Sequence, residues 1–179
     1  MADIRLLVPA DAAAYATLRL QAFEQHPQAF TSSAEEEAQK PLSWSVQRLT
    51  PDPSKPHDAF WGAFEAGELV GMVGLHGRYR PKEQHNATVV GMYVAQTASH
   101  RGLGRALLQA LLAQARQWPT LEQVDLTVTA GNLSAQHLYE TCGFNVYGVL
   151  PHAVKVNGQD HAKVLMVRRL HDTPTQARG

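Results

Sequence analysis

The sequence predicts a mixed α/β (α+β) fold, in which helices cover both faces of a mixed sheet within one domain. Residues 59–65 and 69–79 are rich in strand-forming residues on either side of a short turn, which predicts an antiparallel hairpin. Residues 87–129 hold an apolar strand, an amphipathic helix and a second strand, and this order implies a parallel pair. The 179 residues suit one domain. We expect it over residues 1–170, followed by a polar tail over residues 171–179.

The first part of the chain is expected to supply one strand and two helices. Residues 4–8 alternate as a short first strand. Asp11 can cap a helix that runs to about Gln25. After a loop, Ser33 can cap a second helix, which begins with three glutamates and continues through Leu49.

The second part alternates strands and helices. Residues 87–94 form a continuous apolar run, which is typical of a central strand buried on both faces. Asn132 can cap a short helix, and Gly143 is placed to end it. The remaining elements are expected to be a helix over residues 102–117, strands over 124–129, 144–150 and 161–169, and the helix over 133–141.

Composition excludes several classes of function. Sixteen basic and sixteen acidic residues give a formal net charge of zero, which argues against a nucleic-acid partner. No apolar run approaches the length of a membrane span, and the first residues do not resemble a signal peptide, so we expect no membrane partner. A single cysteine rules out an internal disulfide and favours a cytoplasmic protein. Nine histidines occur without zinc-ligand spacing, so we expect no metal.

The strongest local motif is a loop that follows the apolar strand and opens a helix. Backbone N–H groups in the first turn of a helix are free and carry partial positive charge, so they can bind anions. Gly102 and Gly104 would let an anion approach this backbone closely, and Arg101 and Arg105 add charge. On these residues alone, an anion site and a simple turn are equally supported.

Two segments resemble the GNAT family of N-acetyltransferases. Residues 94–108 resemble its coenzyme A loop, whose pattern is Gln/Arg-x-x-Gly-x-Gly/Ala, although Ser99 stands where Gln or Arg is usual. Residues 126–144 resemble the family's strand–Asn–helix–Tyr–Gly-Phe segment, with Asn132 and Tyr139 at the matching positions. The two matches occur in the family's order and at a fitting distance, which makes them more specific than either alone.

The resemblance implies a mostly antiparallel sheet with a central, splayed parallel pair, acetyl-CoA as co-substrate, and an amine-bearing small molecule as acceptor. A homodimer is possible by the same analogy. It implies that a bulge within residues 92–94, in the strand before the loop, frees an amide for the oxyanion. It also implies that loop amides bind the pyrophosphate and that Asn132 contacts the pantetheine arm. The implied cofactor-binding residues are Met92, Tyr93, Val94, Ser99, His100, Arg101, Gly102, Leu103, Gly104, Arg105, Asn132, Ala135 and Tyr139.

By the same resemblance Tyr139 is the general acid, although a tyrosine on an apolar helix face can equally be a core residue. The general base is open. Glu83 and His85 lie near the start of the central strand and are candidates by location; the further candidates are Glu35, Glu36, Glu37, His76 and Tyr93.

The acceptor is not identified by any motif. The loop over residues 26–32, with Trp44 and Tyr15, could line a small acceptor pocket. A protein N-terminus or a lysine side chain is the alternative acceptor. A catalytically idle module that senses acyl-CoA is the alternative to an enzyme.

Overall fold

A computed structural model describes residues 1–171 of the chain. It contains one seven-stranded sheet in the order β1-β2-β3-β4-β5-β7-β6, and only β4 and β5 pair in parallel. The mixed sheet with one parallel pair is therefore confirmed. The expected polar tail lies outside the described residues apart from its first residue. The strands are β1 (Asp3–Leu6), β2 (Ala59–Glu65), β3 (Glu68–Gly77), β4 (Asn86–Val94), β5 (Gln123–Thr129), β6 (Asn145–Val156) and β7 (Gln159–Arg169).

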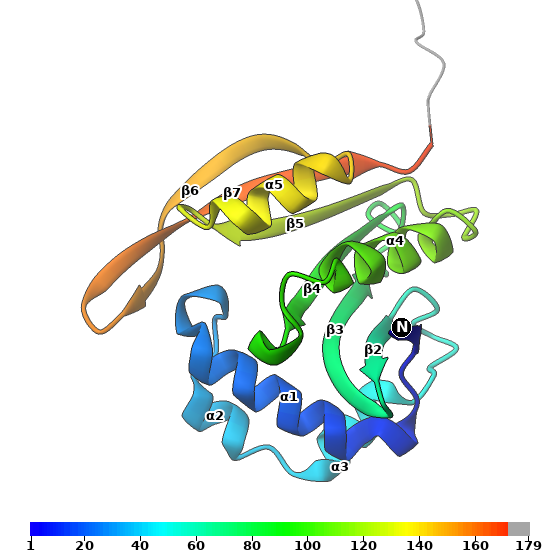
Figure 1. The fold of residues 1–179 in the computed structure, drawn as a ribbon. Coiled ribbons are helices and arrows are strands. Elements are labelled where there is room, and N and C mark those ends of the chain that lie inside the picture. Colours follow the sequence, from blue (N-terminus) through cyan, green and yellow to red (C-terminus); the bar gives the residue numbers. More distant parts are fainter. Residues whose placement is uncertain (172–179) are drawn as a thin grey trace, which may run out of the picture.

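Helices cover both faces of the sheet (Figure 1). On one face, α4 and α5 pack through a core of leucines, valines, Tyr139 and Phe144. On the other face, α1 contributes Tyr15, Leu18 and Ala22 to a second core. The helices are α1 (Ala12–Gln25), α2 (Ala34–Ala38), α3 (Leu42–Leu49), α4 (Leu103–Ala115) and α5 (Leu133–Thr141), with short 3-10 turns η1 (Pro9–Asp11), η2 (Pro27–Ala29) and η3 (Gln96–Ala98).

The parallel pair opens soon after it begins. Pairing between β4 and β5 covers only residues 86–88 of β4 and 123–125 of β5. Further along, β4 carries one extra residue against β3, since Met72 pairs with Tyr93 but Gly74 pairs with Val90. The bulge therefore lies at Gly91 and Met92, whereas we expected it within residues 92–94. Gly91 takes φ +62°, a conformation that glycine adopts without strain, which explains why the bulge forms there.

The helix caps agree with the sequence in two places and differ in one. Ser33 accepts from the Glu36 N–H, and the Glu36 carboxylate accepts from the Ser33 N–H, so the expected cap is a full capping box. Asn132 accepts from the Ala135 N–H, as expected of an N-cap. Asp11 precedes α1 but does not cap it, because its carboxylate accepts from the Val8 N–H and pairs with an arginine.

Two elements have different lengths from those expected. The helix predicted from Ser33 to Leu49 is two helices, because Pro41 cannot continue α2 and instead precedes α3. Strand β6 extends to Val156 rather than ending near residue 150, and its hairpin with β7 projects from the sheet (Figure 1).

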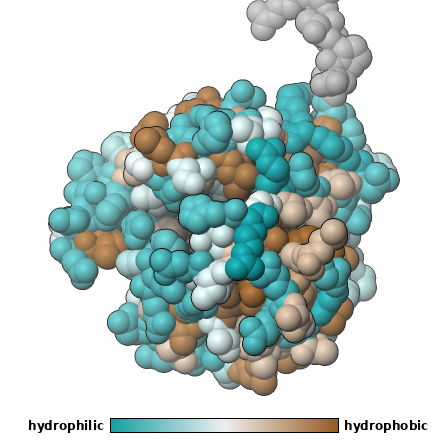
Figure 2. All heavy atoms as spheres, in the orientation of Figure 1, coloured by the Kyte–Doolittle hydropathy of each residue, from teal (hydrophilic) through white to brown (hydrophobic). Residues whose placement is uncertain are grey.

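The surface in the orientation of Figure 1 is mainly hydrophilic, with hydrophobic side chains in several separate groups (Figure 2). Within residues 1–171, no helix has the length and apolar character needed to cross a membrane.

Candidate active site

A cavity of about 400 Å³ lies where β4 and β5 separate. Side chains from both faces of the sheet line it, so the opening between the strands connects the α5 side with the α1 side. The lining residues are Arg19, Phe23, Ala29, Phe30, Thr31, Ser32, Arg48, His76, Thr88, Val89, Val90, Gly91, Met92, Leu126, Thr127, Val128, Thr129, Asn132, Ala135, Leu138, Tyr139 and Lys163.

Tyr139 is the titratable residue of the cavity on the α5 side. It is 7% exposed and packs its ring against Phe144, with 6.0 Å between the ring centroids. Its hydroxyl makes no hydrogen bond within the described part of the chain, yet it is not among the atoms sealed from solvent. Burial raises the pKa of the Tyr139 phenol above its usual value, so the group stays protonated and can donate.

Four of the residues expected to contact the cofactor lie together here. Met92, Asn132, Ala135 and Tyr139 all line the cavity. The Asn132 side chain accepts from the Ala135 N–H at 3.2 Å, which leaves its amide NH₂ free to donate to a ligand.

The glycine loop borders the cavity but does not line it. The first hydrogen bond of α4 runs from the Ala106 N–H to the Gly102 carbonyl, so the amides from Gly102 to Arg105 have no helical partner. Gly102 takes φ +75°, and a Cβ built on Gly104 would lie 3.2 Å from the Leu138 side chain, which lines the cavity. The loop thus presents free N–H groups beside the opening between the strands.

Other predicted site residues point elsewhere. The Tyr93 hydroxyl donates to Gln25 at 2.7 Å, and its ring packs in the core under α1. Ser99 donates to the Gln96 carbonyl at 2.8 Å. His100 is exposed and Arg105 donates to Thr141.

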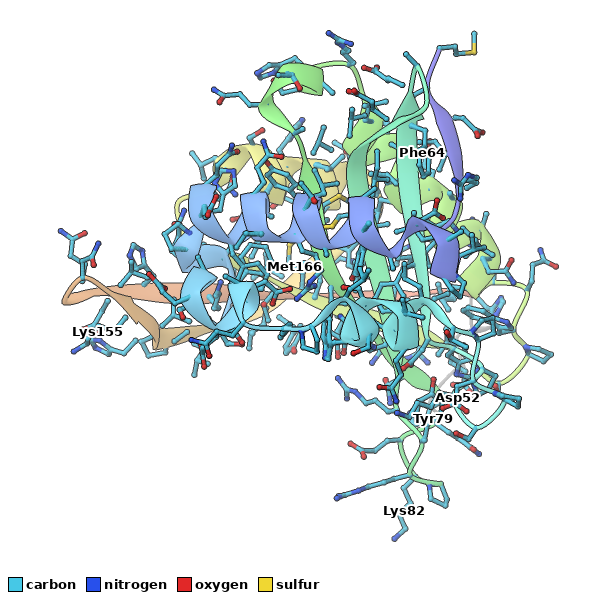
Figure 3. All side chains as sticks on the ribbon, turned by 90° about the horizontal axis from the view of Figure 1, so that it is seen from below. Asp52, Phe64, Tyr79, Lys82, Lys155 and Met166 are labelled. Carbon is cyan, nitrogen blue, oxygen red and sulfur yellow. The ribbon has the colours of Figure 1, made fainter. Side chains whose placement is uncertain are left out.

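Glu83 does not lie in the cavity. It belongs to the loop that precedes β4, next to Lys82, which points away from the body of the molecule (Figure 3). The strands separate at the opposite end of β4. Neither Glu83 nor His85 lines the cavity, so this structure does not bring either candidate base into the opening.

The acceptor side agrees in part with the expected pocket. Residues 29–32 line the cavity as predicted, whereas Tyr15 and Trp44 do not. The Tyr15 hydroxyl instead accepts from Arg48, and the Trp44 ring lies under three cationic side chains.

His76 is the candidate base that the structure brings into the cavity. Nη2 of Arg48 lies 3.0 Å from its Nε2. Since a guanidinium can only donate, Nε2 must be the unprotonated nitrogen and Nδ1 must carry the proton, 3.4 Å from the Asp58 carboxylate. The lone pair of the imidazole is therefore on Nε2, which faces Arg48 in the cavity lining.

Sequence reasoning missed three cations of the lining, Arg19, Arg48 and Lys163. They come from α1, α3 and β7, and no local motif surrounds them. Only their place in the cavity identifies them, and that place is a property of the folded chain.

Comparison with known proteins agrees with this geometry. The family model described as Acetyltransferase (GNAT) family matches residues 19–144. The chain is 28% identical over 82 residues to the L-amino acid N-acetyltransferase AaaT of Escherichia coli K12, covering 46% of this chain and 50% of that relative. It therefore spans about half the length of this curated relative. It is 33% identical over 119 residues to the N-alpha-acetyltransferase RimI of Mycobacterium tuberculosis, covering 65% and 71%.

Among solved structures, yncA from Salmonella typhimurium, whose structure holds its cofactor acetyl-CoA, superposes with a TM-score of 0.78 at 20% identity. The superposition covers 100% of this chain and 99% of that one. The splayed strands, the glycine loop and the Asn132–Tyr139 helix lie within or beside the matched residues. The chain therefore belongs to the GNAT acetyltransferase family.

Proposed function

We propose that the chain is an N-acetyltransferase that moves an acetyl group from acetyl-CoA to the primary amine of a small molecule by direct attack. The observation that carries the proposal is the opening between β4 and β5, with the buried Tyr139 hydroxyl inside it and the free amides of α4 beside it. An extended thioester arm can enter such an opening, whereas a paired sheet would exclude it.

Acetyl-CoA would bind along these features in order. The amides from Gly102 to Arg105 would hold the pyrophosphate, because unpaired N–H groups at a helix N-terminus favour anions. The arm would then pass Asn132 and Ala135 between the strands. The edge of β4 over residues 92–94 would supply donors to the thioester carbonyl, since no strand pairs with β4 there on the β5 side.

The reaction would proceed by one addition and one elimination. The neutral amine attacks the thioester carbon, a C–N bond forms, and backbone N–H groups at the bulge stabilise the oxyanion. The C–S bond then breaks, and Tyr139 shares its proton with the departing thiolate through a hydrogen bond. Because burial raises the pKa of the phenol above that of a thiol, Tyr139 would regain a proton, and the one that the amine has lost balances the step.

His76 is the proposed acceptor of the amine proton. Its Nε2 lone pair accepts from Arg48 in this structure and would become free for the amine proton when the Arg48 guanidinium turns to a bound acceptor. Among residues 1–171, no aspartate or glutamate lines the cavity. Asp58 would stabilise the imidazolium that forms, as it lies 3.4 Å from Nδ1. The proton would pass directly or through ordered water.

A small acceptor is favoured by the size of the cavity and by AaaT, which is named for L-amino acids. Acetylation of a protein N-terminus is the second candidate, because RimI is named an N-alpha-acetyltransferase. An acyl-CoA sensor is less favoured, since a module without catalysis has no need of a protonated tyrosine in the opening.

The test is release of coenzyme A from acetyl-CoA with a panel of amines and with peptides that have free N-termini. We expect turnover with small amines, and we expect His76→Gln to slow it for every acceptor. Binding of acetyl-CoA without turnover on any acceptor would favour the sensor, and turnover only with peptides would favour the second candidate.

A further inference from the structure

The acceptor side of the cavity is cationic. Arg19, Arg48 and Lys163 line it, and within residues 1–171 no aspartate or glutamate does. These three cations differ in their partners within the protein. The difference shows which of them is free to bind an anionic ligand.

Arg19 is already neutralised. Its Nε donates to one carboxylate oxygen of Glu37 at 2.6 Å and Nη2 donates to the other at 3.2 Å. Burial alone would raise the pKa of Glu37, but its hydrogen bonds from Arg19 and Lys40 lower it overall, so the carboxylate stays charged. Arg19 therefore has its anion within the protein.

Arg48 has no anion in direct contact among the described residues. Its Nε donates to the Tyr15 hydroxyl at 3.1 Å, and its Nη2 donates to His76 Nε2 at 3.0 Å. The guanidinium also lies 4.6 Å from the Phe60 ring centroid. All these partners are neutral. They fix the position of the planar guanidinium group and leave three of its five N–H donors unused.

Lys163 also lacks a carboxylate partner in the described part of the chain. Its ammonium donates to the Gln28 carbonyl at 2.8 Å and to the Thr129 hydroxyl at 3.0 Å. It is 7% exposed, and burial lowers its pKa. Its donors hold the η2 loop against β5, so its contribution to a ligand would be its charge.

We propose that the acceptor carries a carboxylate beside its amine and that Arg48 binds this carboxylate. This inference rests on the proposed N-acetyltransferase function. Arg48 is half-buried, so its charge is partly removed from water with no anion beside it, and a bound carboxylate would offset that cost. The fixed, planar fork of arginine matches a carboxylate.

The same charges exclude other acceptors. A polyamine or a lysine-rich peptide would bring further positive charge next to Arg48 and Lys163, and no acid in the lining would offset it. Asp58 lies next to His76 on the side away from Arg48. Its carboxylate already accepts from the Tyr79 hydroxyl and the Gly77 N–H and lies 3.4 Å from the His76 imidazole.

The experiment compares matched acceptors, such as L-methionine with 3-(methylthio)propylamine and L-leucine with 3-methylbutylamine. Each pair differs in the carboxylate, which also lowers the pKa of the neighbouring amine, so the part of the preference that Arg48 supplies is the part lost in Arg48→Gln. We expect kcat/KM to be higher for the amino acid of the pair by about 30-fold or more.

Arg48→Gln should remove most of that preference by raising KM for the amino acid much more than for the decarboxylated amine. The measure is the ratio of the two kcat/KM values within each variant, because Arg48 also contacts His76 and its loss can change turnover of both acceptors. Arg48→Lys should restore part of it, because the charge remains but the fork is lost. Arg80→Gln is the matched control, since Arg80 is exposed in the loop before β4 and should change neither acceptor.

The outcomes separate this inference from the proposed function. Equal turnover of both members of each pair, or an unchanged preference in Arg48→Gln, would overturn the carboxylate site while leaving the N-acetyltransferase in place. Failure of acetyl transfer to every amine would overturn the function itself. Protection of the wild type against heat by 2-hydroxy-4-(methylthio)butanoate, which has the carboxylate and no amine, should occur and should be lost in Arg48→Gln.

Discussion

Nη1 of Arg101, in the loop before α4, lies 2.7 Å from Oε2 of Glu65, the last residue of β2. Arg101 was expected to give its charge to the pyrophosphate of acetyl-CoA, but a carboxylate holds it in this structure. The Arg101 side chain is 56% exposed, so the pair is weak and can exchange its partner at low cost. Glu65 therefore competes with the phosphates of acetyl-CoA for the Arg101 side chain.

Glu65→Gln should release Arg101 and tighten acetyl-CoA binding by about two- to threefold at low salt, the size expected of one exposed charge pair. The gain should disappear at high salt because ions screen exposed charges. Calorimetric titration at two salt concentrations measures it. The same substitution in an Arg101→Ala background is the control, and a gain there would mean that Arg101 is not the charge concerned.

The glycine loop should bind phosphate through its backbone. Gly102→Val should weaken acetyl-CoA binding about tenfold or more, because φ +75° is strained for a β-branched residue and the loop amides would turn. Ser99→Ala should change the dissociation constant less than twofold, since the Ser99 hydroxyl is committed to the Gln96 carbonyl. Titration of both variants, with circular dichroism to verify folding, decides the point. The reverse order of effects would mean that side chains hold the phosphates.

Tyr139→Phe should lower kcat by about 100-fold, the usual range for loss of a general acid, and should change acetyl-CoA affinity little. The ring and its contact with Phe144 are kept in this variant, so a loss of packing would not explain the effect. Burial raises the Tyr139 pKa, so ionisation of the phenol should not reduce wild-type activity at any pH below about 10. Steady-state rates over that pH range test both expectations, and full turnover of Tyr139→Phe would remove the acid role.

Local patterns predicted most of the fold. The hairpin, the strand–helix–strand unit and the caps at Ser33 and Asn132 all depend on residues close in sequence, and all are confirmed. The second helix was predicted too long because its apolar spacing continued past Pro41 and outweighed the proline in our interpretation. Asp11 was predicted to cap α1, but the Val8 amide lies closer to its carboxylate.

The site residues could be predicted only where they lie close together in the sequence. Tyr139, Asn132 and Ala135 share one short helix and were found together. Pairing of the sheet and packing of α3 bring Arg48, His76 and Lys163 into one cavity. No short sequence motif indicates this arrangement. Glu83 was chosen for its closeness in sequence to β4, but it lies at the wrong end of that strand.

Strand β6 is an edge of the sheet and exposes large apolar side chains, and we expect it to pair the chain with a second copy. Tyr147 is 60% exposed and Val149 is 57% exposed. An open edge with apolar residues favours association. Sedimentation should show a dimer for the wild type and a monomer for Tyr147→Lys/Val149→Lys. Substitution of Leu42→Lys, also exposed but on α3, is the control, and a monomeric wild type would contradict the expectation.

His57 should make the protein less stable in acid. It is 6% exposed, its Nδ1 has no hydrogen-bond partner, and its ring lies against Trp118 with centroids 5.2 Å apart. Burial lowers the His57 pKa in the folded chain, although Asp58 partly opposes this. In the unfolded chain the imidazole takes a proton near pH 6.5. The unfolded state therefore binds more protons as pH falls below that value, and the free energy of unfolding should fall by up to about 1.4 kcal/mol per pH unit until the folded-state pKa is passed. Urea titrations between pH 8 and pH 5 measure this slope.

His57→Phe should reduce the slope because an apolar ring fills the same place, whereas His137→Gln, at an exposed position, should not. An equal slope in wild type and His57→Phe would assign the acid sensitivity to other groups.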